Sequence, residues 1–337
     1  MRRLTAQAPA KLILSGEHAV LYDQPAIAMA VNRYTTTTTT WRDTPHIHFK
    51  FLDLAYAKSH TCAALRRLAM NLQNDYNSFL EGKCSIRKVL KRPFQLLQYS
   101  VSNLLDSLNV TLPCGVEIAV DSTIPIGCGM GSSAAAVLST LYSVTNFLDY
   151  KWQRADYLSF SKSIENLQHG RSSGLDLHLS TYGGCVLFKD GEVQARPVPQ
   201  MPMYIVNTGK PTSSTGECVS AVAPLFKDQG LANEFGNVTR NIDQAINQND
   251  LHDFKRGIKD NHALLQRIGV VPAKVSKFIH AIEQYGGAAK VCGAGAVSGK
   301  NAGIVLIVAD PEIKDLVKMH GYSLQTIQVD PYGTRII

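Results

Sequence analysis

The chain has 337 residues, of which 45% are hydrophobic and 18% are charged, and its net charge is +7. This composition excludes an intrinsically disordered chain and predicts a globular protein of two domains. The clearest apolar run, residues 302–309, is far shorter than the roughly 20 residues of a membrane span. The positive charge favours anionic partners such as phosphorylated small molecules, anionic lipid or nucleic acid.

The seven cysteines and the N-terminus indicate a cytoplasmic protein without a membrane partner. The odd cysteine count and the lack of a CxxC pair argue against a disulfide framework and a structural zinc site. Arg2 and Arg3 precede an apolar stretch, but Lys11, Glu17 and His18 interrupt it too early for a signal peptide.

The densest basic stretch is Arg87, Lys88, Lys91 and Arg92, in a region with helical spacing and just before Pro93. We interpret it as the solvated face of a helix. No zinc-finger, RRM or KH signature accompanies it, so the sequence does not predict a nucleic-acid partner.

The first half of the chain alternates groups of strands and helices. Short apolar runs around a turn predict strands at residues 12–14 and 26–31, and the threonine run at 35–40 predicts another. Apolar residues at three- and four-residue intervals predict helices between 65 and 108. A strand at 116–120, a loop at 127–133, helices from Ser132 and over 155–169, and a strand at 183–188 follow.

The second half repeats this mixture. The sequence predicts a strand at 204–207, helices at 233–249 and 252–267, a glycine-rich loop at 290–303 and a strand at 304–308. Strands gathered between helices favour an α+β fold with two packed lobes over a doubly wound sheet. We place the domains at residues 1–195 and 196–337.

The loop from Pro125 to Ala134 reads PIGCGMGSSA. Glycines at alternate positions let a backbone approach a ligand closely, and the helix that follows offers an N-terminus with free N–H groups that favour an anion. A phosphate cradle, with a serine hydroxyl placed for a metal ion, fits this pattern as well as a tight strand–helix turn does. The spacing matches neither a Walker A loop nor a Rossmann fingerprint.

A pair of carboxylates follows, Glu165 near the end of a predicted helix and Asp176 beyond Gly170. One carboxylate is suited to holding Mg²⁺, which prefers oxygen ligands, and the other to accepting the proton of a hydroxyl. Taken alone, the pair fits a solvated helix residue and an N-cap better.

Lys11 interrupts an apolar strand, which is unusual because lysine is rarely buried without a partner. A carboxylate such as Glu17 or Asp176 is the expected partner. An edge-strand lysine that extends to solvent explains the pattern equally well.

Together and in this order, these stretches resemble the GHMP kinases, whose pattern combines a basic residue on an N-terminal strand, a PxGxGxGSSA loop and a C-terminal GAG loop, here at 293–295. Within them, KLILSGEHAVLYDQPAIA at 11–28 and the ExxxHGxxSGxD spacing at 165–176 are similar to mevalonate kinases. The resemblance implies an α+β, two-lobed fold, with an N-terminal lobe like domain 2 of ribosomal protein S5 and a ferredoxin-like C-terminal lobe.

The resemblance also implies residue roles. Asp176 would be the catalytic base and Lys11 would pair with it and stabilise the transferring phosphoryl group. Mg²⁺ would be held by Glu165 and Ser133, with Ser132 as the second choice. The implied ATP-binding residues are Pro125, Gly127, Gly129, Met130, Gly131, Ser132, Ser133 and Ala134. The implied substrate-binding residues are Lys11, Glu17, His18, Asp176, Thr215, Gly293 and Ala294.

The implied reaction is ATP-dependent phosphorylation of the primary alcohol of mevalonate to 5-phosphomevalonate in isoprenoid biosynthesis. A phosphomevalonate or sugar kinase of the same superfamily is the alternative. A homodimer is common in the family. Two departures affect local shape: side chains occupy the loop at 293–300, where the family has more glycine, and Ala136 stands where animal members often have tyrosine.

Overall fold

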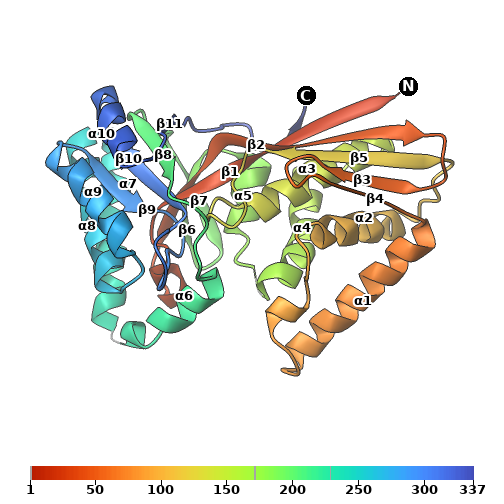
Figure 1. Cartoon of the computed structure of the whole chain (residues 1–337), viewed down its shortest axis with the longest axis horizontal. Coiled ribbons are helices and arrows are strands. Elements are labelled where there is room, and N and C mark those ends of the chain that lie inside the picture. The colour runs from red at the N-terminus through yellow and green to blue at the C-terminus, as the bar shows by residue number, and fades with distance from the viewer. Residues whose placement is uncertain (1, 171, 228) are drawn as a thin grey trace.

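The computed structural model describes residues 2–170, 172–227 and 229–337. They form two lobes that lie side by side in Figure 1, with both ends of the chain at the edge of the same lobe. The α+β fold predicted from the clustering of strands and helices is confirmed by two mainly antiparallel sheets with helices packed on them.

The first lobe is built, within these residues, on an eight-stranded sheet with the order β12-β1-β2-β5-β3-β4, to which β6 and β7 are attached through β2. Its pairs are antiparallel except the parallel pair of β3 and β5. The strands are β1 (Arg3–Ser15), β2 (Ala26–Arg42), β3 (Ile47–Phe51), β4 (Tyr56–His60), β5 (Gly115–Ser122), β6 (Cys185–Lys189), β7 (Glu192–Arg196) and β12 (Arg335–Ile336). The helices are α1 (Cys62–Leu80), α2 (Gln95–Ser107), α3 (Ser132–Phe147), α4 (Arg154–His169) and α5 (Leu175–Tyr182).

The threonine run lies in β2 and shows why a polar repeat forms a central strand. Alternate side chains of a strand point to the same face, and Thr35, Thr37 and Thr39 are fully buried. Their hydroxyls need partners there. Thr37 Oγ1 lies 2.9 Å from Ser139 Oγ, and Thr39 Oγ1 lies 2.7 Å from Ser143 Oγ. These bonds join β2 to α3.

Helix α3 packs against β1 and β2 and is buried along most of its length. Val137, Leu138 and Leu141 are fully buried on it, opposite Leu12 and Leu14 of β1 in the same apolar cluster. Full burial stabilises such side chains by about 1.5–3 kcal/mol each. The core therefore fixes where the N-terminus of α3 lies.

The second lobe has a four-stranded antiparallel sheet with the order β11-β8-β10-β9. The strands are β8 (Met203–Asn207), β9 (Ala288–Val291), β10 (Ile304–Val308) and β11 (Gln325–Thr326), and the helices are α6 (Thr215–Val222), α7 (Gln229–Gln248), α8 (Leu251–Arg267), α9 (Ala273–Gln284) and α10 (Lys314–Met319). The chain runs from strand through helices to two strands, a helix and a last strand, which is a ferredoxin-like arrangement.

The two lobes exchange segments. After the second lobe, the chain returns to the first sheet, where β12 pairs with β1. Strand β7, which also belongs to the first sheet, ends at Arg196. In the other direction, Ala19 joins the apolar cluster of α7 and α8, and Tyr22 stacks on Phe226 at 4.5 Å. The division at residues 195 and 196 stays a prediction.

Two sequence interpretations need correction. The basic stretch at 87–92 does not lie on an α-helix, because α1 ends at Leu80 and only the 3-10 turn η2 (Ile86–Lys88) precedes α2. Pro93, which has no N–H to donate, separates the stretch from α2. The glycine-rich loop also begins later than expected, since Lys290 and Val291 belong to β9.

Among the described residues, no helix has the length and apolar character that a bilayer crossing requires.

Candidate functional site

Three separate segments of the first lobe meet at the N-terminus of α3. Lys11 lies on β1 and Asp176 lies in the first turn of α5, and Lys11 Nζ is 3.1 Å from Asp176 Oδ1. The backbone N–H of Lys11 donates to the carbonyl oxygen of Met130 at 3.0 Å. The lysine side chain is 7% exposed and the aspartate side chain 32%. The carboxylate is therefore the member of the pair that a ligand can reach.

Gly131 is the N-cap of α3 and must be a glycine for two reasons. Its φ is +69°, in the left-handed region that side chains disfavour. A Cβ there would also lie 2.9 Å from Lys11 Cγ and 3.4 Å from Asp176 Oδ2. The loop therefore approaches the ion pair as closely as a backbone can.

The N-terminus of α3 is open to an anion. Gly131 supplies no side-chain cap, so the N–H groups of Ser132 and Ser133 point out of the helix with its positive dipole end. The side chains of Met130 and Ala134 are buried in the core, at 1% and 0% exposure. For these two predicted ATP-binding residues, only the backbone is therefore available to a ligand.

Ser133 and Glu165 form a second group beside the first. Ser133 Oγ donates to Glu165 Oε2 at 3.2 Å, and His169 Nε2 lies 3.4 Å from the same oxygen. The other carboxylate oxygen, Oε1, is buried and has no hydrogen-bond partner within the described parts of the chain. An uncompensated buried carboxylate oxygen beside a hydroxyl is a pair of oxygen donors suited to a hard cation.

The pKa of His169 depends on the charge of this group. Burial lowers the pKa of its imidazole, but the hydrogen bond to Glu165 and the negative charges of Glu165 and Asp176 outweigh burial, so the pKa is raised overall. The histidine therefore senses both predicted functional carboxylates.

The second glycine loop packs directly on the first. A Cβ on Gly129 would lie 3.1 Å from the carbonyl oxygen of Cys292, and a Cβ on Gly293 would lie 3.3 Å from Gly129 Cα. The next residue, Ala294, has its carbonyl oxygen 3.1 Å from His18 Nε2. Three of the predicted substrate-binding residues (His18, Gly293 and Ala294) are thus brought to the loop at 125–134, the predicted phosphate loop.

Glu17, predicted to lie near the substrate, forms an ion pair with Lys290 of β9, and the two side chains are only 1% and 0% exposed. The sequence did not single out Lys290 as this partner. Burial lowers the pKa of the neighbouring His18 to about 4, with the charge of Lys290 adding to it against the bond to Ala294. Burial and Lys290 likewise lower the pKa of His262 to about 4.

Lys210 is a second residue that the sequence interpretation missed. Its Cε lies 3.4 Å from the position of a Cβ on Gly127, so the side chain runs along the phosphate loop. Burial raises the pKa of Cys128 in that loop, and the positive charge of Lys210 opposes the rise. Lys210 lies outside the short motifs that the sequence analysis singled out.

Residues 95–184 match the family described as GHMP kinases N terminal domain, and this span includes the whole loop at 125–134 and both carboxylates. This span of the chain is therefore similar to the GHMP kinases.

Similarity to curated proteins extends over nearly the whole chain. The chain is 26% identical to the mevalonate kinase of Pyrococcus abyssi, with 99% of this chain and 98% of the relative covered. It is 26% identical to the mevalonate kinase of Pyrococcus horikoshii, with 88% and 87% covered. The solved mevalonate kinase of Methanococcus jannaschii superposes with a TM-score of 0.83 at 24% identity, over 98% and 99% of the two chains. This last likeness establishes the fold.

Thr215, the remaining predicted substrate-binding residue, is the first residue of α6 and is exposed. Within the described chain, no hydrogen bond joins it to the other predicted site residues. Helix α6 is nevertheless tied to the second glycine loop, because Cys218 Sγ lies 3.5 Å from the carbonyl oxygen of Gly295. The role of Thr215 stays a prediction.

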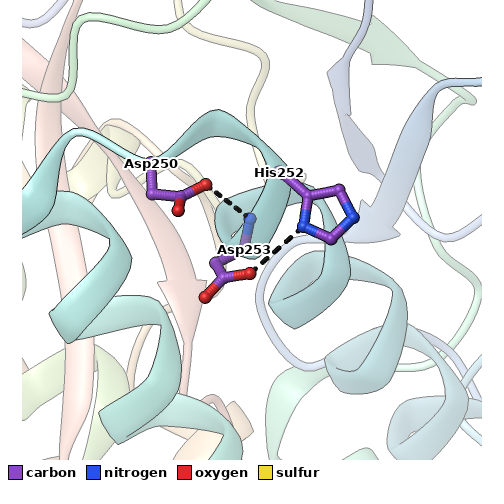
Figure 2. Close-up of side chains that lie close together, drawn as sticks. All are labelled: Asp250, His252 and Asp253. Carbon is purple, nitrogen blue, oxygen red and sulfur yellow. Dashed lines mark hydrogen bonds and ion pairs between the residues drawn. The ribbon is translucent and has the colours of Figure 1, made fainter.

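One more group of metal-capable side chains lies away from these loops, at the start of α8 (Figure 2). Asp250 is the N-cap of this helix and accepts from the Asp253 N–H at 2.9 Å. Asp253 lies 3.2 Å from His252 Nδ1 and 3.1 Å from an Arg256 guanidinium nitrogen. Asp250 thus serves as a helix cap, and Asp253 already pairs with the Arg256 guanidinium, so we assign no metal to this group.

Proposed function

We propose that this GHMP kinase transfers the γ-phosphoryl group of ATP to the primary alcohol of mevalonate, giving 5-phosphomevalonate for isoprenoid biosynthesis. The observation that carries the proposal is the convergence of Lys11 and Asp176 on Gly131, at the anion-attracting end of α3. The names of the Pyrococcus relatives, which match nearly the whole chain, support the choice of mevalonate as the acceptor.

Mg²⁺ fits the oxygen atoms beside this helix end. Glu165 and Ser133 offer a carboxylate and a hydroxyl within 3.2 Å of each other, and one carboxylate oxygen has no partner among the described residues. Mg²⁺ usually takes one or two protein oxygens and completes its shell with phosphate and water. Bound there, the ion would neutralise charge on the β- and γ-phosphates.

The chain's own residues then supply position and proton transfer. The N–H groups at the start of α3 and the backbone of Gly127 and Gly129 bind phosphate oxygens. Asp176 accepts the proton of the attacking hydroxyl, because its carboxylate is the exposed member of the ion pair. Lys11 holds that carboxylate in place and offsets negative charge on the transferring group. Lys210 is placed to meet phosphate oxygens from the loop's outer side.

The substrate side is assigned to the second glycine loop and its partner histidine. His18 is neutral near pH 7, because burial lowers its pKa to about 4, so it can orient an acceptor through hydrogen bonds rather than charge. Its ring is held by Ala294. Glu17 pairs with Lys290 and is buried, so it would position its neighbours without contacting the substrate.

We further propose that the enzyme works in the cytoplasm, since all seven cysteines are free thiols, as a reducing compartment maintains them. A homodimer is carried over from the family resemblance, and analytical ultracentrifugation tests it.

A coupled ADP-release assay tests the function. We expect turnover with mevalonate and Mg²⁺-ATP, with 5-phosphomevalonate identified by ³¹P NMR, and little turnover with phosphomevalonate or galactose. Preferential turnover of either alternative acceptor would assign a different GHMP kinase activity. Absence of ADP release with every acceptor, by protein that binds ATP, would contradict the enzymatic proposal.

A further inference from the structure

Lys91 and Arg92, the end of the basic stretch before α2, line a groove that the activity proposed above does not use. Two adjoining cavities of about 460 Å³ and 370 Å³ lie between α1, β4 and the start of α2, and both are lined by Leu68 and Gln95. These volumes fall in the range of small-molecule pockets, about 300–1,000 Å³. None of the residues that line them belongs to the phosphate-loop site.

The groove is positively charged. Lys58 and Arg92 line the smaller cavity, whose lining contains no carboxylate. Arg67 and Lys91 line the larger cavity, together with Asp75 as its one acid. Among the described residues, none of these four cations has an ion pair or a side-chain hydrogen bond. The first turn of α1, the positive end of a 19-residue helix, lines the larger cavity as well.

The smaller cavity also has a polar floor with an unmet bond. The side chain of Gln98 is buried (1% exposed), and its Nε2 lies 3.1 Å from Nε2 of buried His60. Its Oε1 has no partner in the described chain. A buried acceptor without a donor costs about 1–3 kcal/mol. A ligand that donates to this oxygen would recover that cost.

An apolar wall completes the cavity. The rings of Tyr56 and Phe94 stack with centroids 3.9 Å apart, and both line the smaller cavity together with Leu68. Cations at the rim, an aromatic wall and an acceptor at the floor are three different kinds of contact. They match three different parts of one small molecule.

We propose that this groove binds a small organic anion, a phosphate or carboxylate with an aromatic or apolar body and a hydrogen-bond donor. The anionic group contacts Lys58 and Arg92, the body lies against Phe94, and the donor bonds Gln98 Oε1. The site is separate from the phosphate loop, so this proposal does not depend on the proposed kinase activity.

Methyl NMR of the full chain tests this site with 4-aminophenyl phosphate and 4-aminobenzoate as probes. A non-hydrolysable ATP analogue with Mg²⁺ is added first, so that the nucleotide site is occupied. We expect the Leu68 methyl signals to shift saturably with either probe, and about tenfold weaker binding of the neutral 4-aminophenol. Tighter binding of the phosphate than of the carboxylate would identify a dianion as the preferred group. Leu68 signals that do not move with either anion would overturn the proposal.

Variants separate this groove from general surface charge. Lys58→Gln combined with Arg92→Gln changes two exposed side chains and should weaken the anionic probes about tenfold. The matched control, Lys277→Gln with Lys318→Gln, removes two exposed lysines from α9 and α10 and should leave binding unchanged. Equal affinities of the two double variants for the anionic probes would contradict the proposal.

The floor contact has its own test. 4-Aminophenyl phosphate should bind more tightly than phenyl phosphate to the wild-type chain, because only the former can donate to Gln98 Oε1. In Gln98→Met this advantage should vanish while the charge dependence remains. An advantage that persists in folded Gln98→Met would contradict the assigned orientation.

Discussion

Two of the lysine–carboxylate pairs lie near the glycine loops, and their surroundings differ. Lys11 and Asp176 meet at 3.1 Å under the phosphate loop, with the aspartate 32% exposed. Glu17 and Lys290 are closed off by both lobes, with side-chain exposures of 1% and 0%. The exposure of Asp176 meets the requirement of its proposed role, because a group that accepts a substrate proton must reach the substrate. The buried pair can only position its neighbours.

The histidines beside the two pairs show the same contrast. Nearby carboxylates raise the pKa of His169, despite burial, because negative charge gathers at the open pair. At the closed pair, burial lowers the pKa of His18 and of His262 to about 4. The open region therefore favours protonation of its histidine, and the closed region disfavours it.

The largest expected effect is on the open pair. Asp176→Asn keeps the size of the side chain but cannot accept a proton, so kcat should fall about 10²–10⁴-fold while ATP affinity is retained. Coupled ADP release measures kcat, and displacement of a fluorescent nucleotide measures affinity.

Asp190→Asn is the matched control for this change. Asp190 lies in an exposed turn with φ +53°, a conformation that asparagine tolerates. It should leave kcat unchanged. Near-normal kcat in Asp176→Asn would remove the base assignment and with it the contrast between the two pairs.

At the closed pair, we expect a loss of stability. Lys290→Met leaves the Glu17 carboxylate buried without a partner, which should lower the free energy of unfolding by about 3–5 kcal/mol. Urea denaturation measures this change. Adding Glu17→Gln to Lys290→Met should recover part of the loss, because the uncompensated charge is removed.

The exposed pair of Lys83 and Glu81 provides the control for that experiment. Their side chains are 71% and 57% exposed, so Lys83→Met should change stability by no more than about 1 kcal/mol. An equally small loss in Lys290→Met would show that the buried pair contributes no more than a surface one.

The histidines predict opposite pH dependences. Between about pH 6.5 and pH 4 the unfolded chain protonates His18 and His262 whereas the folded chain does not, so stability falls as the pH falls through this window. His169 contributes in the other direction. Its raised pKa gives stability below about pH 6.5 that is lost as the pH rises through its folded-state value.

Histidine NMR titration measures the three values separately. Glu165→Gln removes the largest influence that raises the pKa of His169, so that pKa should fall, while those of His18 and His262 stay near 4. An unchanged His169 titration in Glu165→Gln would contradict the coupling between these two side chains.

The smallest expected effect concerns Lys210, at the outer side of the open region. Lys210→Met should weaken ATP binding about two- to fivefold, because an exposed charge contact contributes about 0.5–1 kcal/mol. Nucleotide displacement at low ionic strength measures it, and Lys318→Met of α10 is the control. Equal affinities in the two variants would exclude Lys210 from phosphate binding.

Local patterns predicted most elements of the fold. Period-two burial of Thr35, Thr37 and Thr39 follows from the strand, and the apolar spacing of residues 96–108 appears as the buried face of α2. The basic stretch misled the helix prediction, because charge and spacing alone do not reveal where a chain turns. The exchange of segments between lobes was also hidden, since β12 pairs with a strand more than 300 residues earlier.

The site was predicted in part. The glycine spacing, Lys11 and the two carboxylates were visible as short motifs, and of the two partners left open for Lys11 the structure selects Asp176. Lys290 and Lys210 gave no such signal, because neither belongs to one of the short motifs that indicated chemistry. Their relevance depends on which distant residue they face.

By itself, the amino-acid sequence determined the α+β class, the glycine spacing of the loop at 125–134 and the residue types proposed to bind a triphosphate, because those properties reside in residue type and local spacing. Only the tertiary structure decided which lysine faces which carboxylate, which of the pairs stays open to solvent, and where the basic segment forms a groove. Burial and long-range contact set the electrostatics of each charged group, and neither is encoded within a few neighbouring residues.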